Sequence, residues 1–151
     1  MAVDDATLID ALARLVGRDH VLTRDVEVAP YVVDWRGRYQ GAARAIVRPA
    51  TSGQVAAIVA HCHEARVPIV PQGGNTGMCG GATPDASGRE IVVSLARLRT
   101  IRAVDRQNAT ITVEAGATLA AVQEAAAEAG LLFPLSLASE GSCTIARAAP
   151  W

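Results

Sequence analysis

Hydrophobic residues recur at helical spacing in three segments of the chain. Residues 5–16 have an acidic start and end before Gly17, which predicts a first helix. Thr51 and Gln54 form a capping-box pattern, which predicts a second helix that ends near Arg66. Thr118 begins a third helix that Gly130 ends. The predicted apolar faces are Leu8, Leu12, Leu15 and Val16; Val55, Ile58, Val59 and Cys62; and Leu119, Val122 and Ala126.

Short apolar runs of strand type flank the second helix. Ala43–Arg48 precedes it and Ile69–Val70 follows it, and this strand–helix–strand order predicts parallel pairing with a right-handed crossover. Glu90–Leu95 is a further predicted strand.

The later strands alternate apolar and polar residues. Thr100–Val104 and Ala109–Glu114 flank the turn-rich Asp105–Asn108, which predicts an antiparallel hairpin, and Leu131–Phe133 could be one more strand. The expected class is α+β, with a small parallel β-α-β unit followed by an antiparallel sheet with helices. The expected division is a lead-in over residues 1–42, a domain over 43–145 and a tail over 146–151.

Composition excludes several classes of protein. The 151 residues fit one domain, and a net charge of −1 gives no basic surface for nucleic acid. The 14 cationic side chains are all arginine, so the lysine that a phosphate-binding P-loop or Schiff-base chemistry requires is absent. No apolar run approaches the ~20 residues of a membrane span. Met1–Ala6 carries two aspartates and no basic region, so no signal peptide is expected.

The three cysteines, Cys62, Cys79 and Cys143, lie far apart and form no CxxC pair. We therefore expect free thiols in a reducing cytoplasm. His61 and His63 are two residues apart on a predicted helix, so they point about 200° from one another and cannot share a metal ion from one turn. The sequence indicates no metal site and no catalytic residue.

Residues 71–81 hold five of the thirteen glycines of the chain. Glycine permits positive φ and close approach to the backbone, so successive N–H groups can form an anion-binding nest that suits a pyrophosphate without lysine. Thr76 could add a hydroxyl and Asn75 an amide. No helix follows the loop, which argues against a Rossmann fingerprint. The alternatives are a flexible loop without a ligand and a nest for a different anion.

Two other segments have features of ligand loops. Phe133–Ile145 places three serines and a threonine directly after an apolar run, where hydroxyl groups could meet the polar edge of a cofactor. Tyr31–Tyr39 gathers aromatic and cationic side chains. Residues 31–39 are read equally as a ligand loop or as a surface segment anchored by Trp35.

Several motifs together resemble one flavoprotein family. They are Arg48-Pro49-x-Thr51, Pro71–Gly77 with Gly80-Gly81, Val113–Gly116 and Pro134–Ile145. In this order they resemble the N-terminal FAD-binding part of the vanillyl-alcohol-oxidase/p-cresol-methylhydroxylase superfamily. The similarity is greatest to the D-lactate, D-2-hydroxyglutarate and glycolate dehydrogenase group. The resemblance implies two α+β subdomains with FAD between them.

The resemblance also implies a set of cofactor-binding residues. Some members bind flavin covalently through a histidine after the paired glycines, but this chain has Asn75 there, which implies non-covalent FAD. The implied FAD-binding residues are Gln72, Gly73, Gly74, Asn75, Thr76, Gly77, Gly80, Gly81, Pro134, Ser139, Gly141, Ser142 and Thr144.

The chain departs from the family pattern after Ile145, where Gly-Gly-Asn would follow and Ala146–Trp151 stands instead. We expect a truncated chain without the substrate domain. One hypothesis is the FAD-binding module of an oxidoreductase acting on D-2-hydroxy acids, with little turnover by itself. The other is a non-catalytic flavin-binding subunit or a defunct fragment that needs a partner chain to supply the substrate domain.

Overall fold

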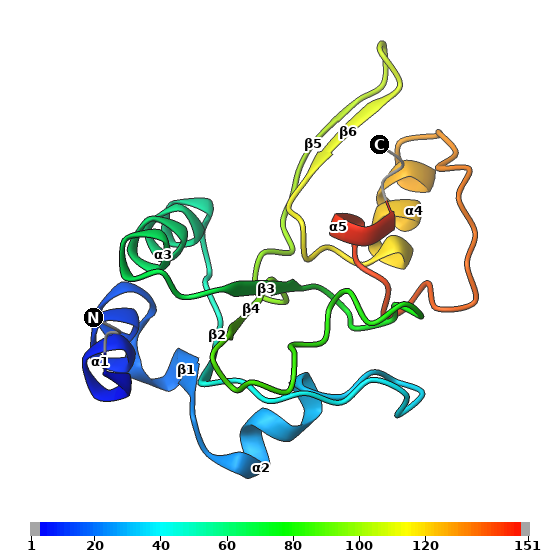
Figure 1. Ribbon diagram of the computed structural model, residues 1–151. Coiled ribbons are helices and arrows are strands. Elements are labelled where there is room, and N and C mark those ends of the chain that lie inside the picture. The colour runs from blue at the N-terminus through cyan, green and yellow to red at the C-terminus, as the bar shows by residue number, and fades with distance from the viewer. Residues whose placement is uncertain (1–3, 149–151) are drawn as a thin grey trace.

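The computed structural model describes residues 4–148 and arranges them as a mixed sheet with helices and a smaller lobe beside it (Figure 1). The sheet has the strand order β1-β2-β4-β3, in which β1 is antiparallel to β2 and the other pairs are parallel. Its strands are β1 (Val21–Leu22), β2 (Ala45–Val47), β3 (Ile69–Gln72) and β4 (Ile91–Ser94).

The strand β4 occupies the interior of this sheet. The two strands that flank the second helix, β2 and β3, are parallel as predicted, but they do not pair with each other because β4 lies between them. All four residues of β4 are buried, and three of them are β-branched and apolar. An interior position pairs both edges of such a strand and lets both of its faces be buried, so the chain passes through β3 and then returns to insert β4.

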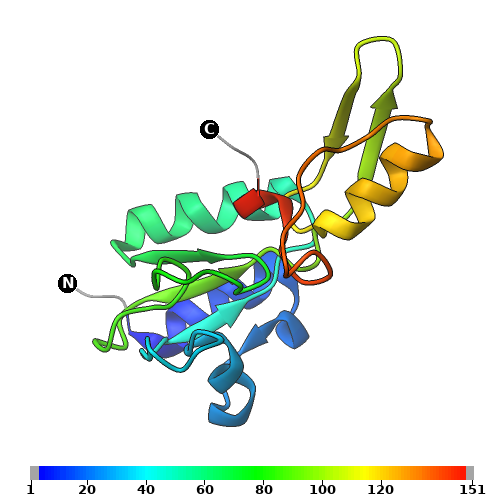
Figure 2. The same ribbon diagram turned by 90° about the vertical axis from the view of Figure 1, so that its right-hand side faces the viewer.

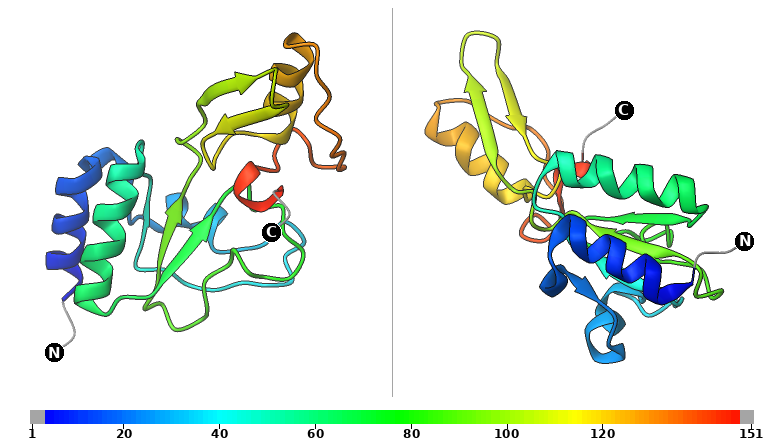
Figure 3. Two further views of the ribbon diagram at one scale, coloured as in Figure 1. Left: turned by 90° about the horizontal axis from the view of Figure 1, so that it is seen from above. Right: turned by 90° about the vertical axis from the view of Figure 1, so that its left-hand side faces the viewer.

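Two helices cover one face of the sheet. The helices α1 (Asp5–Val16) and α3 (Ser52–Ala65) lie side by side there (Figure 3). Their buried residues form one core cluster with alternate strand residues. The opposite face packs against the segment that holds α2 (Asp25–Val28) and the 3-10 turn Ala29–Tyr31. The first cluster includes Leu8, Leu12, Val16, Ile58, Cys62, Val47, Ile91 and Val93, and the second includes Ile46, Val70 and Val92.

The start of α3 follows the predicted cap with one difference. Thr51 Oγ1 accepts a hydrogen bond from the Gln54 amide at 3.2 Å, but Gln54 Oε1 accepts from the Ala50 amide at 2.7 Å rather than from that of Thr51. Gln54 Nε2 donates to the Leu15 carbonyl, which ties the two helices together. Val59, which was expected on the apolar face, is 48% exposed because it lies one position beyond Ile58 and faces away from the sheet.

The second lobe projects from the sheet (Figure 2). As predicted, its two strands form an antiparallel hairpin, and α4 packs against β5. Leu119, Val122 and Ala126 are the buried face of α4. The strand predicted at 131–133 is wrong, since these residues are coil and Leu132 is 84% exposed. The elements are β5 (Ile101–Asp105), β6 (Thr110–Val113), α4 (Leu119–Glu128) and the short α5 (Ile145–Ala148). Among residues 4–148, no helix has the length and apolarity that crossing a bilayer requires.

The three cysteines differ in accessibility. Cys62 and Cys143 are buried and Cys79 is exposed, and burial raises the pKa of the Cys62 thiol to about 11. We expect a thiol reagent such as DTNB to modify one thiol per native chain and all three after denaturation. Cys79→Ser should remove the native reaction. Rapid modification of two or more thiols in the folded chain would contradict the buried positions.

Candidate cofactor-binding site

The glycine loop, residues 73–81, leaves the end of β3 and packs against residues 142–144. A Cβ built on Gly74 would overlap the carbonyl oxygen of Ser142, and one built on Gly73 would overlap Thr144 Oγ1. Neither glycine has the positive φ that by itself demands glycine. Close approach of the two segments therefore explains why both positions lack a side chain.

The amides at the start of the glycine loop have no acceptor in the described part of the chain. Among residues 4–148, none of the N–H groups of residues 73–77 donates a hydrogen bond to a backbone or side-chain oxygen. Folded chains pair most of their backbone donors, so a run of free donors indicates a surface available to water or to an anion. The loop therefore has free backbone donors, which the predicted nest requires.

Thr144 adds a second unpaired polar group at the same place. Thr144 is 5% exposed, and its buried Oγ1 has no hydrogen-bond partner within residues 4–148. Buried hydroxyl groups are normally paired, and an unpaired one costs about 1–3 kcal/mol. The free amides and this hydroxyl are thus neutral polar groups without a protein partner on two segments that contact each other.

Two of the predicted ligand residues use their side chains to hold the loop. Gln72 is buried, and its Nε2 donates to the carbonyls of Tyr31 and Ala82, both at 2.8 Å. Asn75 Nδ2 donates to the Val33 carbonyl at 2.8 Å, and Asn75 has a φ of +51°. Asparagine tolerates this left-handed conformation better than most residues. These two side chains connect the glycine loop to residues 31–33.

We expect Asn75→Ala to destabilise the fold by about 1–2 kcal/mol, because it removes a hydrogen bond and leaves a Cβ at positive φ without the compensation that asparagine provides. Asn75→Gly is the matched control, since it also removes the hydrogen bond but relieves the strain. It should therefore be less harmful than alanine in urea unfolding. Equal stability of the alanine variant and the natural chain would contradict the bracing role.

A cavity of about 670 Å³ brings together residues from three separate segments. Thr76, Ser139 and Ser142 were predicted to contact a cofactor, and all three line it. Gly141 is exposed with open space around it, Pro134 is exposed, and neither lines this cavity. The complete lining is Trp35, Thr76, Met78, Leu137, Ala138, Ser139, Ser142 and Cys143.

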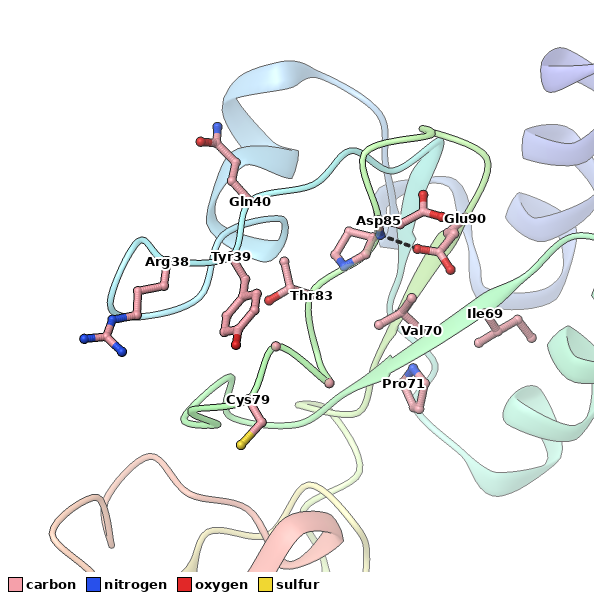
Figure 4. Close-up of a pocket in the computed structure, with 13 residues that line it drawn as sticks. Arg38, Tyr39, Gln40, Ile69, Val70, Pro71, Cys79, Thr83, Asp85 and Glu90 are labelled. Atoms are coloured by element: carbon pink, nitrogen blue, oxygen red, sulfur yellow. Dashed lines mark hydrogen bonds between the residues drawn. The ribbon is translucent and has the colours of Figure 1, made fainter.

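Gly80 and Gly81 line a different cavity, of about 580 Å³ (Figure 4). Gly80 has a φ of +74°, and a Cβ there would lie 2.9 Å from the ring of Tyr39, whereas Gly81 faces open space. The Asp85 amide donates to Glu90 Oε2 across one end of this cavity, at 2.6 Å. Five of the thirteen predicted cofactor residues thus line these two cavities, three in one and two in the other, and the remaining eight line neither of them.

The loop that carries Trp35 is organised by Asp34. The side chain of Asp34 is buried, and its carboxylate accepts hydrogen bonds from the amides of Tyr39 at 2.7 Å and Arg36 at 3.3 Å. These bonds, that from Tyr39 first, lower the pKa of Asp34 below its usual value. Trp35, Met78 and Leu137 were not among the predicted site residues, although the composition of residues 31–39 had marked Trp35. Within residues 4–148, no three histidine, cysteine or acidic side chains are grouped to hold a metal ion.

Comparison with known proteins provides independent evidence. Residues 43–149 match the family model FAD_binding_4, described as an FAD binding domain. A mitochondrial D-2-hydroxyglutarate dehydrogenase of Bos taurus is 38% identical over 136 residues, which are 89% of this chain and 24% of that protein. A D-2-hydroxyglutarate dehydrogenase of Xanthomonas citri pv. viticola is 40% identical over 126 residues, 82% of this chain and 26% of that protein. The chain thus spans about a quarter of the length of these relatives.

Solved structures show the same fold. An alkyldihydroxyacetonephosphate synthase superposes with a TM-score of 0.83 at 19% identity over 95% of this chain and 28% of its own. A p-cresol methylhydroxylase superposes with a TM-score of 0.76 at 24% identity over 91% of this chain and 27% of its own. The predicted α+β fold of the vanillyl-alcohol-oxidase/p-cresol-methylhydroxylase type is confirmed.

Proposed function

Because the chain belongs to the FAD-binding domain family, we propose that its glycine loop and residues 134–144 hold FAD for an oxidoreductase that acts on D-2-hydroxy acids. The observation that carries this proposal is the run of free amides at residues 73–77 beside the unpaired hydroxyl of Thr144. Together they supply neutral donors for an anion where the chain has no lysine.

Each segment has its own part in the proposed site. The amides of residues 73–77 would hold the FAD diphosphate, while Gln72 and Asn75 keep the loop in place. Ser139, Ser142 and Thr144, with Pro134 and Gly141 on the same segment, would meet the flavin and its ribityl chain. Bound FAD would supply the redox chemistry, and this chain would bind the cofactor, orient it and limit its contact with water.

We further propose that the FAD is bound non-covalently. Asn75 stands at the position of the attachment histidine in some superfamily members, and its side-chain amide is already bonded to the Val33 carbonyl. An amide is also a poor nucleophile. Acid precipitation of the yellow protein should therefore release all of the flavin into the supernatant, and flavin retained in the pellet would contradict this part of the proposal.

The substrate class and compartment are parts of the same proposal. The names of the Bos taurus and Xanthomonas relatives support D-2-hydroxyglutarate as one substrate of the complete enzyme, with D-lactate and glycolate as the other members of the class. Three free cysteines support a reducing compartment, for which we propose the cytoplasm, although several relatives are named as mitochondrial. Fractionation of cells that express the chain distinguishes the two compartments.

A second candidate function is a flavin-holding subunit that another chain completes. Trp35 and Met78 are at least half exposed around the larger cavity, and Leu137 is 40% exposed. Such a group of exposed apolar side chains favours a covering partner. A chain that supplies the substrate domain would be that partner.

Purification of the chain and a dye-reduction assay separate these functions. Yellow protein that reduces a dye with D-2-hydroxyglutarate or D-lactate supports the oxidoreductase module. Yellow protein that is inert alone but gains turnover with a partner chain supports the subunit. Colourless protein that FAD cannot reconstitute would contradict both.

A further inference from the structure

Residues 33–40 form a closed loop with a fixed shape. The Asp34 amide donates to the Tyr39 carbonyl at 3.0 Å, the Gly37 amide donates to the Asp34 carbonyl at 2.9 Å, and Val33 and Gln40 pair at the base. Asp34 is 3% exposed, and two backbone N–H groups donate to its carboxylate. A buried carboxylate bonded in this way fixes the backbone on both sides of Trp35.

The same loop is fastened to the glycine loop. Asn75 donates to the Val33 carbonyl, and Gln72 donates to the Tyr31 carbonyl just before the closed loop begins. The ring of Tyr39 lies against Gly80, where a Cβ would come within 2.9 Å of it. These contacts between the two loops therefore fix the position of Trp35 relative to the glycine loop.

Trp35 is a large aromatic side chain that this rigid loop leaves 61% exposed while it lines the cavity of Thr76, Ser139 and Ser142. The guanidinium carbon of Arg36 lies 4.8 Å from the centroid of the indole ring, so the cation covers one ring face. Because Trp35 is 61% exposed, much of the indole is left open to a ligand. Planar heteroaromatic rings stack well on tryptophan, and FAD carries two such rings.

We infer that Trp35 is a further wall of the FAD site, that its indole stacks on a planar ring of the bound cofactor, and that Asp34 is the positioning residue that holds it there. This inference rests on the proposed FAD site. It favours the interpretation of this segment as a ligand loop over that of a surface segment anchored by Trp35. Arg36 adds a positive charge at the same wall, which favours the anionic cofactor.

The test uses fluorine NMR of the chain labelled with 5-fluorotryptophan. The chain has two tryptophans, so Trp151→Phe leaves a single resonance from Trp35. Addition of FAD should move this resonance through the ring current of the stacked ligand. FMN, which carries the flavin ring, and ADP, which carries the adenine ring, are titrated separately. The one that shifts the Trp35 resonance identifies the ring that stacks.

Affinity measurements provide the second readout. Calorimetric titration with FAD should show binding weakened about tenfold by Trp35→Ala and about threefold or less by Trp35→Phe, which keeps an aromatic face. Asp34→Asn should weaken FAD binding about threefold and broaden the Trp35 resonance of the free chain, because one acceptor of the closed loop becomes a donor. Asp105→Asn is the matched control, since Asp105 also accepts from two backbone amides but lies at the end of β5, where the hairpin turn begins. It should change neither quantity.

The outcomes distinguish failure of this inference from failure of the proposed FAD site on which it rests. A shifted resonance with weaker binding of the alanine variant supports the inference. Tight FAD binding with an unmoved Trp35 resonance and unchanged affinity of Trp35→Ala overturns the inference and leaves the proposed function intact. Failure of the natural chain to bind FAD overturns both.

Discussion

Replacing Gly74 with valine will abolish FAD retention. The new Cβ would overlap the backbone carbonyl oxygen of Ser142, which cannot rotate away as a side chain could. The glycine loop and residues 142–144 must then separate, at a cost of about 3 kcal/mol, which corresponds to a loss of affinity of roughly 100-fold. Flavin absorbance after gel filtration, together with calorimetric titration, measures the effect.

Two further variants serve as comparisons for Gly74→Val. Gly81→Ala is the control in the same loop, because a Cβ there meets nothing within 4 Å, and it should retain FAD. Gly73→Ala is a milder change, since its Cβ meets the hydroxyl of Thr144, and Thr144→Ala should partly restore the stability of the Gly73→Ala chain but not its FAD binding, because it also removes the hydroxyl proposed to meet FAD. Circular dichroism establishes that each variant is folded. A folded Gly74→Val chain with the natural affinity for FAD would contradict the packing of the two segments.

FAD will also raise the thermal stability of the chain. A ligand that binds only the folded state at 100 times its Kd stabilises it by about 2.7 kcal/mol. For a domain of about 150 residues this corresponds to a rise in Tm of roughly 5–10 °C. Differential scanning fluorimetry followed through tryptophan emission, or calorimetry, measures the shift.

Riboflavin is the matched ligand for this experiment, because it has the flavin ring and ribityl chain without phosphate. If the amides of residues 73–77 hold the diphosphate, riboflavin should raise the Tm far less than FAD does. An equal shift with riboflavin would show that the diphosphate contributes nothing, and no shift with FAD would contradict cofactor binding by the folded chain.

The helices and the hairpin could be predicted because their signals are local. Thr118 and Gly130 mark the ends of α4 within one segment, and alternation around residues 105–108 marks the hairpin. The position of β4 could not be predicted in this way, because the order of strands depends on which strand pairs with neighbours on both of its edges. A strand was wrongly predicted at residues 131–133, which are coil, because an apolar run forms a strand only where a neighbouring strand pairs with it.

For the candidate site, the sequence likewise predicted the local feature but not its partners in the fold. The density of glycine indicated the loop. The residues that leave no room for a side chain at Gly73 and Gly74, however, are 142–144, about 70 positions further along the chain. The sequence likewise could not show that the Asn75 side chain is engaged with Val33. The place of Trp35 in the cavity depends on the closed loop around Asp34, which only the folded chain brings beside the glycine loop.

The most direct test of the diphosphate site is amide NMR of the nitrogen-15-labelled chain with and without FAD. The N–H groups of residues 73–77, which have no acceptor within residues 4–148, should shift strongly and exchange more slowly with solvent once FAD is bound. If FAD binds and these amides keep their shifts and exchange rates while others change, the diphosphate lies elsewhere and the proposed site is wrong.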